Sequence, residues 1–88
     1  MTQIGYNSSG NYLMVFFEDI LEIYTGKDLQ YITAFYHPKI KSAKFSNNEK
    51  YLITFNGTVN DTKDTENIIV WDFYLGNKIR IFKLEDIE

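Results

Sequence analysis

The chain has 88 residues, enough for one small domain at most, and a formal net charge of −3. This balance argues against the strongly basic footprint of an autonomous nucleic-acid-binding domain, and 44% apolar residues argue against disorder. The absence of cysteine excludes disulfides, a thiol nucleophile and cysteine-based zinc sites.

The longest apolar run, 12–17, is far shorter than the roughly 20 residues that a membrane-spanning helix needs. The chain also opens without the basic and then apolar segments of a signal peptide. We therefore expect a cytoplasmic protein with no membrane partner.

Aromatic residues make up 17% of the chain, and the apolar pattern indicates β-strands almost throughout. Polar or glycine-containing turns bound each expected strand, and the strands in chain order are 11–17, 20–24, 29–35, 40–45, 51–55, 68–73 and 78–82. The stretch 56–67 is polar and has no period. Strands of this length and spacing predict an all-β fold.

An internal repeat relates the two halves of the chain. Residues 6–16 align with 45–55 at an offset of 39, whereas Tyr24 aligns with Trp71 at an offset of 47. The extra residues of the second copy must therefore fall in the polar stretch between its second and third strands. We infer two copies of one four-strand unit, with predicted bounds of 1–38 and 39–88 and a long loop at 56–67.

A unit of about 40 residues with four antiparallel strands is typical of a β-propeller blade. Such a sheet buries both faces only when another sheet stacks on each side, and three or more units are usually needed for stability. We therefore expect the 88 residues to be part of a longer chain, or to associate through bare sheet faces.

The second unit resembles a WD repeat. The similarity is carried by the strand-turn-strand of 45–52, the Trp-Asp pair at Trp71 and Asp72, and the glycine turn that follows. In that family a His, a Ser or Thr, a Trp and an Asp form a hydrogen-bonded network inside the blade. The resemblance implies such a network at His37, Thr54, Trp71 and Asp72.

A narrower resemblance is to the propeller of the b subunit of eukaryotic translation initiation factor three. It is carried by the strand 50–55, the long polar loop after it and the strand 67–72. It implies two adjacent blades of a larger WD-repeat β-propeller, nine-bladed in that family. The implied role is a non-catalytic scaffold whose partners are other initiation factor subunits and the small ribosomal subunit, including its protein and its rRNA. An initiation factor 2A-like propeller, or a general WD-repeat adaptor that mediates protein–protein contacts, is the alternative.

Neither the residues nor the resemblance indicates an enzyme, a catalytic residue, a cofactor, a metal site or a small-molecule substrate. His37 is the only histidine, and it lacks a recognisable nucleophile and orienting group. Without cysteines it also makes a poor transition-metal site, so we favour a structural role. The recurring aromatic residues Tyr6, Tyr12, Phe16, Phe45, Tyr51, Phe55, Trp71 and Phe82 are interpreted as core and not as base-stacking platforms.

Two charged groups are candidates for contacts with a partner. Lys39, Lys41 and Lys44 lie on or beside one expected strand and could meet RNA phosphates; a solvated sheet face or a charge-protected edge is the alternative that we favour. Asp61, Asp64 and Glu66 lie in the long loop, where either partner contact or simple solvation fits. The loop does not match the twelve-residue calcium-binding pattern.

Overall fold

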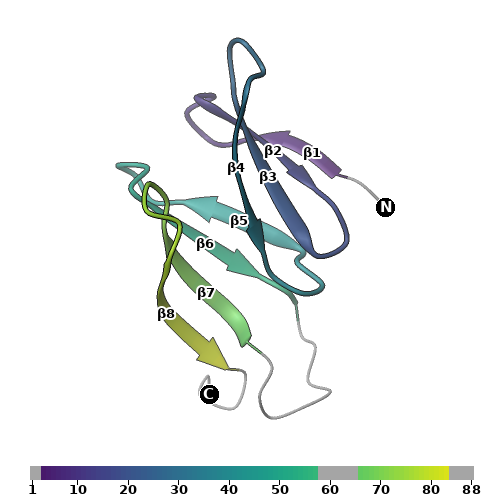
Figure 1. The fold of residues 1–88 in the computed structure, drawn as a ribbon, viewed down its shortest axis with the longest axis vertical. Helices are drawn as coiled ribbons and strands as arrows, with labels where there is room; N and C mark the ends of the chain where they lie inside the picture. Colours follow the sequence, from purple (N-terminus) through teal and green to yellow (C-terminus); the bar gives the residue numbers. More distant parts are fainter. Residues whose placement is uncertain (1–2, 58–65, 84–88) are drawn as a thin grey trace. The chain divides into compact units, whose positions relative to one another are not determined.

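The structure is a computed structural model that describes residues 3–57 and 66–83. These residues form eight β-strands in two four-stranded antiparallel sheets, with orders β1-β2-β3-β4 and β5-β6-β7-β8 (Figure 1). The strands are β1 Gln3–Tyr6, β2 Tyr12–Phe16, β3 Ile20–Thr25, β4 Tyr31–Tyr36, β5 Ser42–Phe45, β6 Tyr51–Phe55, β7 Glu66–Asp72 and β8 Lys78–Lys83. The predicted all-β fold with two antiparallel four-stranded sheets is confirmed.

The chain divides into two compact units, Met1–Ile40 and Lys41–Glu88, and each unit contains one sheet. The predicted blade boundary after residue 38 stays a prediction. Within the described ranges, the chain has no helix of the length and hydropathy needed to cross a membrane.

The repeat seen in the sequence is also present in the strand register. β1 and β2 match β5 and β6 at an offset of 39, and β4 matches β8 at an offset of 47. The pair Leu13↔Tyr24 in the first sheet has its equivalent in the pair Leu52↔Trp71 in the second. Both sheets therefore have the same strand pairing, although periodicity alone did not indicate the short strand β1.

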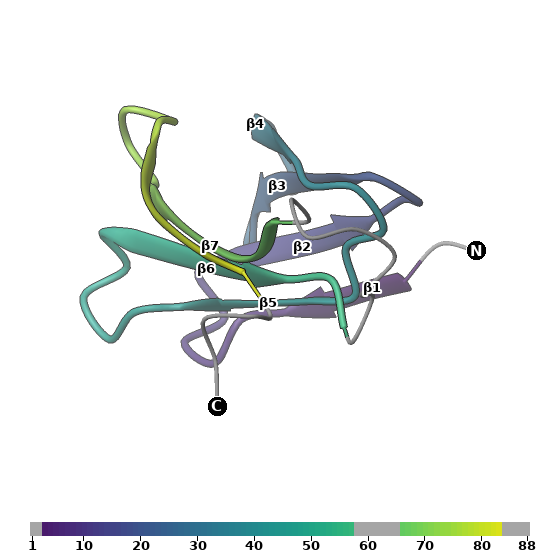
Figure 2. The ribbon, with the colours of Figure 1, turned by 90° about the horizontal axis from the view of Figure 1, so that it is seen from below.

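A register shift lies at the same place in both units. It falls between Ile23 and Tyr24 in β3 and between Val70 and Trp71 in β7. The extra residue lies in the partner strand, Ile32 in β4 and Ile79 in β8. An extra residue bends its strand and increases the local twist. Figure 2 shows β7 and β8 curving together away from β5 and β6.

The turn between the last two strands has the same backbone hydrogen bond and the same positive φ in both units. Leu29 and Gly76 are equivalent, both have positive φ (57° and 79°), and the backbone N–H of each donates to the carbonyl at the start of its turn. The acceptor is Thr25 for Leu29 and Asp72 for Gly76, at 3.0 and 2.8 Å. Tight turns of this kind hold neighbouring strands in the register of a meander.

Each sheet buries one of its faces. The buried apolar side chains include Met14, Leu21, Ile23 and Phe35 in the first sheet and Phe45, Leu52, Ile69 and Trp71 in the second. The prediction that Tyr6 and Tyr51 belong to the core was wrong, because they are 57% and 41% exposed. Each lies on the opposite face of its sheet from the buried set, since residues alternate between faces along a strand.

Candidate functional site

A buried hydrogen bond joins the two central strands of the second sheet. The Trp71 indole N–H on β7 donates to the Thr54 hydroxyl on β6 at 2.9 Å, and both residues are buried. A buried indole N–H costs free energy unless it finds an acceptor. Thr54 supplies that acceptor, so this pair lets a large aromatic ring occupy the core.

Asp72, the residue after Trp71, holds the turn between β7 and β8. Its Oδ1 accepts hydrogen bonds from the backbone N–H groups of Tyr74 and Leu75, at 3.0 and 2.8 Å. A carboxylate that accepts from the backbone two and three residues on stabilises a turn. A further link from Asp72 to the indole stays a prediction.

His37 is fully buried just after β4. Its backbone N–H donates to the Asp19 carbonyl at 2.9 Å, and its carbonyl accepts from Ile40 at 3.1 Å. The Asp19 carboxylate also accepts from the backbone N–H of Lys39 at 2.9 Å. Asp19 therefore anchors the segment that leaves the first sheet, while the place of His37 in a network with Thr54 and Trp71 stays a prediction.

Two buried asparagines that the sequence reasoning missed close the base of the long loop. Asn67 Nδ2 donates to Asn56 Oδ1 at 3.3 Å, and Asn56 Nδ2 donates to the Glu66 carbonyl at 3.2 Å. The Asn56 N–H also donates to the Asn67 carbonyl at 3.1 Å. The two amides therefore tie the end of β6 to the start of β7.

The repeat contains the signal that could have found this pair. Asn56 and Asn67 are equivalent to Phe17 and Ile20, which close a tight turn with the same backbone bond, Phe17 N–H to the Ile20 carbonyl at 2.8 Å. The second unit thus keeps the closing bond but replaces two exposed apolar residues with two buried amides. The two hydrogen-bonded amides therefore stand at the two ends of the insertion in the second unit.

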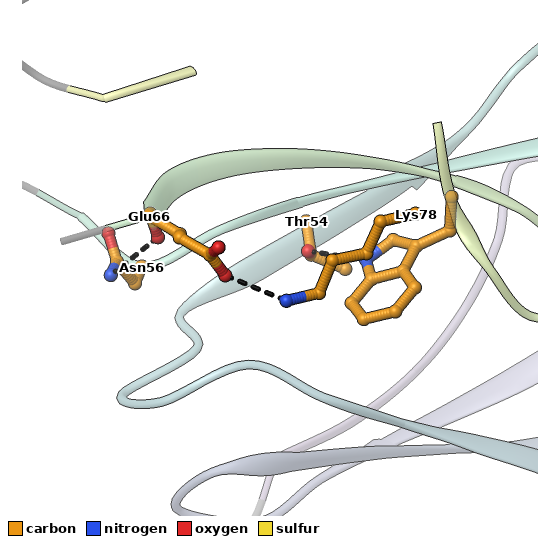
Figure 3. Close-up of polar contacts among 5 residues, drawn as sticks. Thr54, Asn56, Glu66 and Lys78 are labelled. Atoms are coloured by element: carbon orange, nitrogen blue, oxygen red, sulfur yellow. Dashed lines mark hydrogen bonds and ion pairs between the residues drawn. The ribbon is translucent and has the colours of Figure 1, made fainter. Parts of the chain in front are cut away.

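Glu66 forms an ion pair beside this base. Its Oε1 lies 2.8 Å from the Lys78 ammonium, which is 5.7 Å from the centroid of the Trp71 ring (Figure 3). Both side chains of the ion pair are partly exposed, so the pair contributes at most about 1 kcal/mol to stability. Of the three acidic residues predicted as partner contacts, Glu66 has this position, and Asp61 and Asp64 lie outside the described residues.

The three candidate lysines are all exposed, but they do not form one cluster on one unit. Lys39 belongs to the first unit, and Lys41 and Lys44 belong to the second. The methylenes of Lys41 lie against Gly57, which has a φ of +85°, and a Cβ there would come within 2.9 Å of the Lys41 Cδ. Lys41 therefore packs on the start of the long loop, whereas Lys44 lies on the edge strand β5 opposite Ile53.

In the first unit, a hydrogen bond between a tyrosine and a glutamate takes the place of the Trp71–Thr54 bond. Tyr24 is equivalent to Trp71, and its hydroxyl donates to Glu22 Oε1 at 2.8 Å. This hydrogen bond raises the pKa of Tyr24, with smaller contributions from desolvation and from the charge of Glu22. The bond therefore stabilises the fold below the ordinary tyrosine pKa of about 10 and is lost as the pH rises through the raised value.

Within residues 3–57 and 66–83, no three His, Asp or Glu side chains gather as possible metal ligands. The described residues form two sheets with exposed apolar side chains, basic residues on the edge strands β5 and β8 of the second sheet, and a hydrogen-bonded base of the long loop. Such surfaces are suited to binding other macromolecules.

We expect Thr54→Val and Trp71→Phe each to lower the free energy of unfolding by about 1–3 kcal/mol, because each removes one side of a buried hydrogen bond. The double variant should cost less than the sum, with a coupling energy of about 1 kcal/mol, since the second substitution removes the group that the first leaves unpaired. Urea unfolding followed by far-ultraviolet circular dichroism measures all four proteins. Ile53→Val, on the opposite face of β6, is the control and should be additive with Trp71→Phe.

Two antiparallel four-stranded meanders with the same register and the same bulge define the class of the protein: its sheets are units of the β-propeller blade type. A solved structure described as "Crystal structure of the eukaryotic initiation factor" has this fold, with a TM-score of 0.76. It matches 97% of this chain and 22% of its own, at 20% identity.

The relatives found by sequence are more particular. The b subunit of eukaryotic translation initiation factor 3 from Dictyostelium discoideum is 35% identical over 80 residues, which are 90% of this chain and 12% of that protein. The protein of the same name from Xenopus laevis is 29% identical over 84 residues, which are 96% of this chain and 12% of that protein. No protein-family model matches the chain. The predicted resemblance to the b subunit of this factor is confirmed, and the chain spans about an eighth of the length of these relatives.

Proposed function

We propose that the chain is a non-catalytic scaffold segment of a translation initiation factor. In this role it supports assembly of the factor complex on the small ribosomal subunit. The observation that carries the proposal is the similarity to the b subunit of initiation factor 3 over 90% of the chain at 35% identity. The two blade-type sheets agree with this role, because a propeller offers rigid surfaces for partners.

The proposed partners are the other subunits of the factor and the small ribosomal subunit, including its protein and its rRNA, contacted by the full-length protein in the cytoplasm. Exposed lysines can meet rRNA phosphates, and Lys39, Lys41 and Lys44 are the candidates for this contact. The candidates for contacts with protein partners are Asp61, Asp64 and Glu66 of the long loop. His37, Thr54, Trp71 and Asp72 then serve the blade itself and not a partner.

Binding to purified small ribosomal subunits and to purified initiation factor 3 subunits tests this function. The chain is expected to co-sediment with at least one of them in a sucrose gradient. If Lys39 meets a phosphate, Lys39→Glu should weaken ribosome binding and reduce the slope of log affinity against log salt by about one. Lys27→Glu, an exposed lysine in the β3–β4 turn, is the matched control and should leave both quantities unchanged.

A folded chain that fails to bind is the result that contradicts this function. A chain that circular dichroism shows to be folded, but that binds neither the ribosomal particle nor any component of the factor, contradicts the scaffold role. The adaptor function in another pathway would then be favoured.

A further inference from the structure

The chain contains one asparagine that is followed directly by glycine, the pair Asn56 and Gly57 at the start of the long loop. Such a pair has its own chemistry, because asparagine is chemically labile and glycine has no side chain to shield the peptide nitrogen between them. That nitrogen can attack the Asn56 side-chain amide, so the pair is a candidate site of covalent modification. In the first unit the place of Asn56 is taken by Phe17, which has no such chemistry.

The reaction needs solvent water as its only co-reactant. The Gly57 nitrogen loses its proton and forms a bond to Asn56 Cγ, and the bond from Cγ to Nδ2 breaks, so that ammonia leaves and carries the proton away. Water then adds to one carbonyl carbon of the cyclic imide and opens the ring. The product is aspartate, or isoaspartate, in which the backbone runs through the former side chain.

The structure holds the Asn56 amide away from this attack at both of its ends. Nδ2 donates to the Glu66 carbonyl at 3.2 Å (Figure 3), and Oδ1 accepts from Asn67 Nδ2 at 3.3 Å. Attack requires Cγ to turn towards the nitrogen of the next peptide and to come within about 3–3.5 Å of it in the right direction. The amide cannot turn while both bonds to β7 are made, so the closed base of the long loop suppresses the reaction.

Gly57 is shielded as well. It is buried, and an added Cβ would lie 2.9 Å from Lys41 Cδ and 3.2 Å from Lys41 Cε. The Lys41 backbone is fixed in turn, because its N–H donates to the Phe55 carbonyl at 2.8 Å. The apolar stem of a lysine covers what lies beneath it. Lys41 therefore keeps water from the peptide, and water is needed both to take the Gly57 proton and to open the imide.

The product does not fit the site that the amide leaves. A carboxylate still accepts from Asn67, but it has no N–H for the Glu66 carbonyl and sets oxygen against oxygen there. A charge at a position that is 2% exposed also carries a desolvation cost. In isoaspartate the backbone after residue 56 gains a carbon atom, so the chain leaves β6 along a different path. Each product therefore weakens the loop base.

We propose that Asn56 is a site of spontaneous deamidation, which the closed loop base suppresses and whose product keeps the base open. Local opening exposes the pair without unfolding the sheet. The rate at which Asn56 reacts is then the fraction of chains with an open base multiplied by the rate in an unfolded chain. The inference does not rest on the role in translation.

The first measurement compares Asn56 in the folded chain with Asn56 in the same chain in concentrated urea. Tryptic peptide mapping by mass spectrometry follows the reaction, because replacement of an amide by an acid raises the mass of the peptide. We expect Asn56 to react at least about tenfold more slowly in the folded chain, the ratio for a base that costs about 1.4 kcal/mol to open. Equal rates, with circular dichroism showing a folded chain in buffer, would overturn the proposal.

Two variants test the parts of the structure that suppress the reaction. Asn67→Ala removes the donor to Asn56 Oδ1 and should raise the rate in the folded chain about three- to tenfold. Lys41→Ala uncovers Gly57 and should raise it too. Lys44→Ala, which changes an exposed lysine on β5, is the matched control and should leave the rate unchanged. If Asn67→Ala does not fold, Lys41→Ala carries the test, since it alters an exposed side chain; a folded Lys41→Ala chain that reacts at the unaltered rate contradicts the proposed shielding.

The effect of the product is tested with Asn56→Asp. The backbone N–H of residue 56 donates to the Asn67 carbonyl at 3.1 Å. After correction for the intrinsic rate of each residue type, its hydrogen exchange should be at least about tenfold faster in the variant. Asn48→Asp is the matched control, because Asn48 Oδ1 accepts from Ser46 Oγ at 2.7 Å and from the Lys50 N–H at 3.0 Å, and a carboxylate accepts equally well. Unchanged exchange at residue 56 in Asn56→Asp would show that the closed base tolerates the product, and the proposal would be wrong.

Discussion

Replacing Trp71 with alanine is expected to lower the free energy of unfolding by about 3–5 kcal/mol. The ring is almost fully buried, its N–H is bonded to Thr54 and its face lies under the Lys78 ammonium. Small domains have a total stability of about 5–15 kcal/mol, so the variant should be largely unfolded in moderate urea. Far-ultraviolet circular dichroism is the suitable measurement, because Trp71 is the only tryptophan and its fluorescence is removed with it.

Tyr36→Ala is the matched control, since it truncates an aromatic residue that is mostly exposed. Its effect on the free energy of unfolding should stay within about 0.5 kcal/mol when the protein is monomeric. Equal losses in the two variants would show that the Trp71 ring contributes no more than a surface residue. The comparison therefore tests whether the second sheet depends on this one side chain.

Much of the strand order could be predicted because the chain contains the same unit twice. The strand 51–55 was predicted with the bounds that β6 has, and the weak strand β1 followed only from its alignment with β5. Periodicity could not indicate which face of each sheet is buried, because both faces carry apolar residues. That is why Tyr6 and Tyr51 were wrongly assigned to the core.

At the candidate site, the pairing of Thr54 with Trp71 was expected only from the resemblance to a WD repeat, and the chemistry of the two side chains explains the bond that the structure shows. A buried tryptophan needs an acceptor, and Thr54 is the neighbour on β6 that supplies it. Asn56 and Asn67 were missed because asparagine is mostly exposed in proteins, and the hydrogen bonds that offset their burial are seen in the structure. Asp72 follows Trp71 directly, so strand alternation turns it to the opposite face, towards Tyr51 and the turn.

A second large effect is expected at Gly26, in the turn after β3. Its N–H donates to the Asn11 carbonyl at 2.8 Å, and an added Cβ would overlap the Gly10 carbonyl oxygen and lie 3.0 Å from the Asn11 carbonyl carbon. Both obstacles are backbone atoms, which cannot move aside as a flexible side chain can. Gly26→Ala should therefore cost about 3 kcal/mol or more of unfolding free energy, measured by urea unfolding.

Gly5→Ala is the control in the same unit, because nothing lies within 4 Å of its added Cβ. It should leave the free energy of unfolding unchanged or raise it by about 0.4–1 kcal/mol.

The second unit shows the backbone arrangement that the first turn would have to adopt to relieve the overlap in Gly26→Ala. Phe73 is equivalent to Gly26 and keeps the same backbone bond, to Lys50 at 2.9 Å, while its ring packs edge-on against Phe45. If Gly26→Ala is as stable as Gly5→Ala, the first turn can adopt the backbone of the second, and the close approach of Gly10 to Gly26 is not a constraint on the fold.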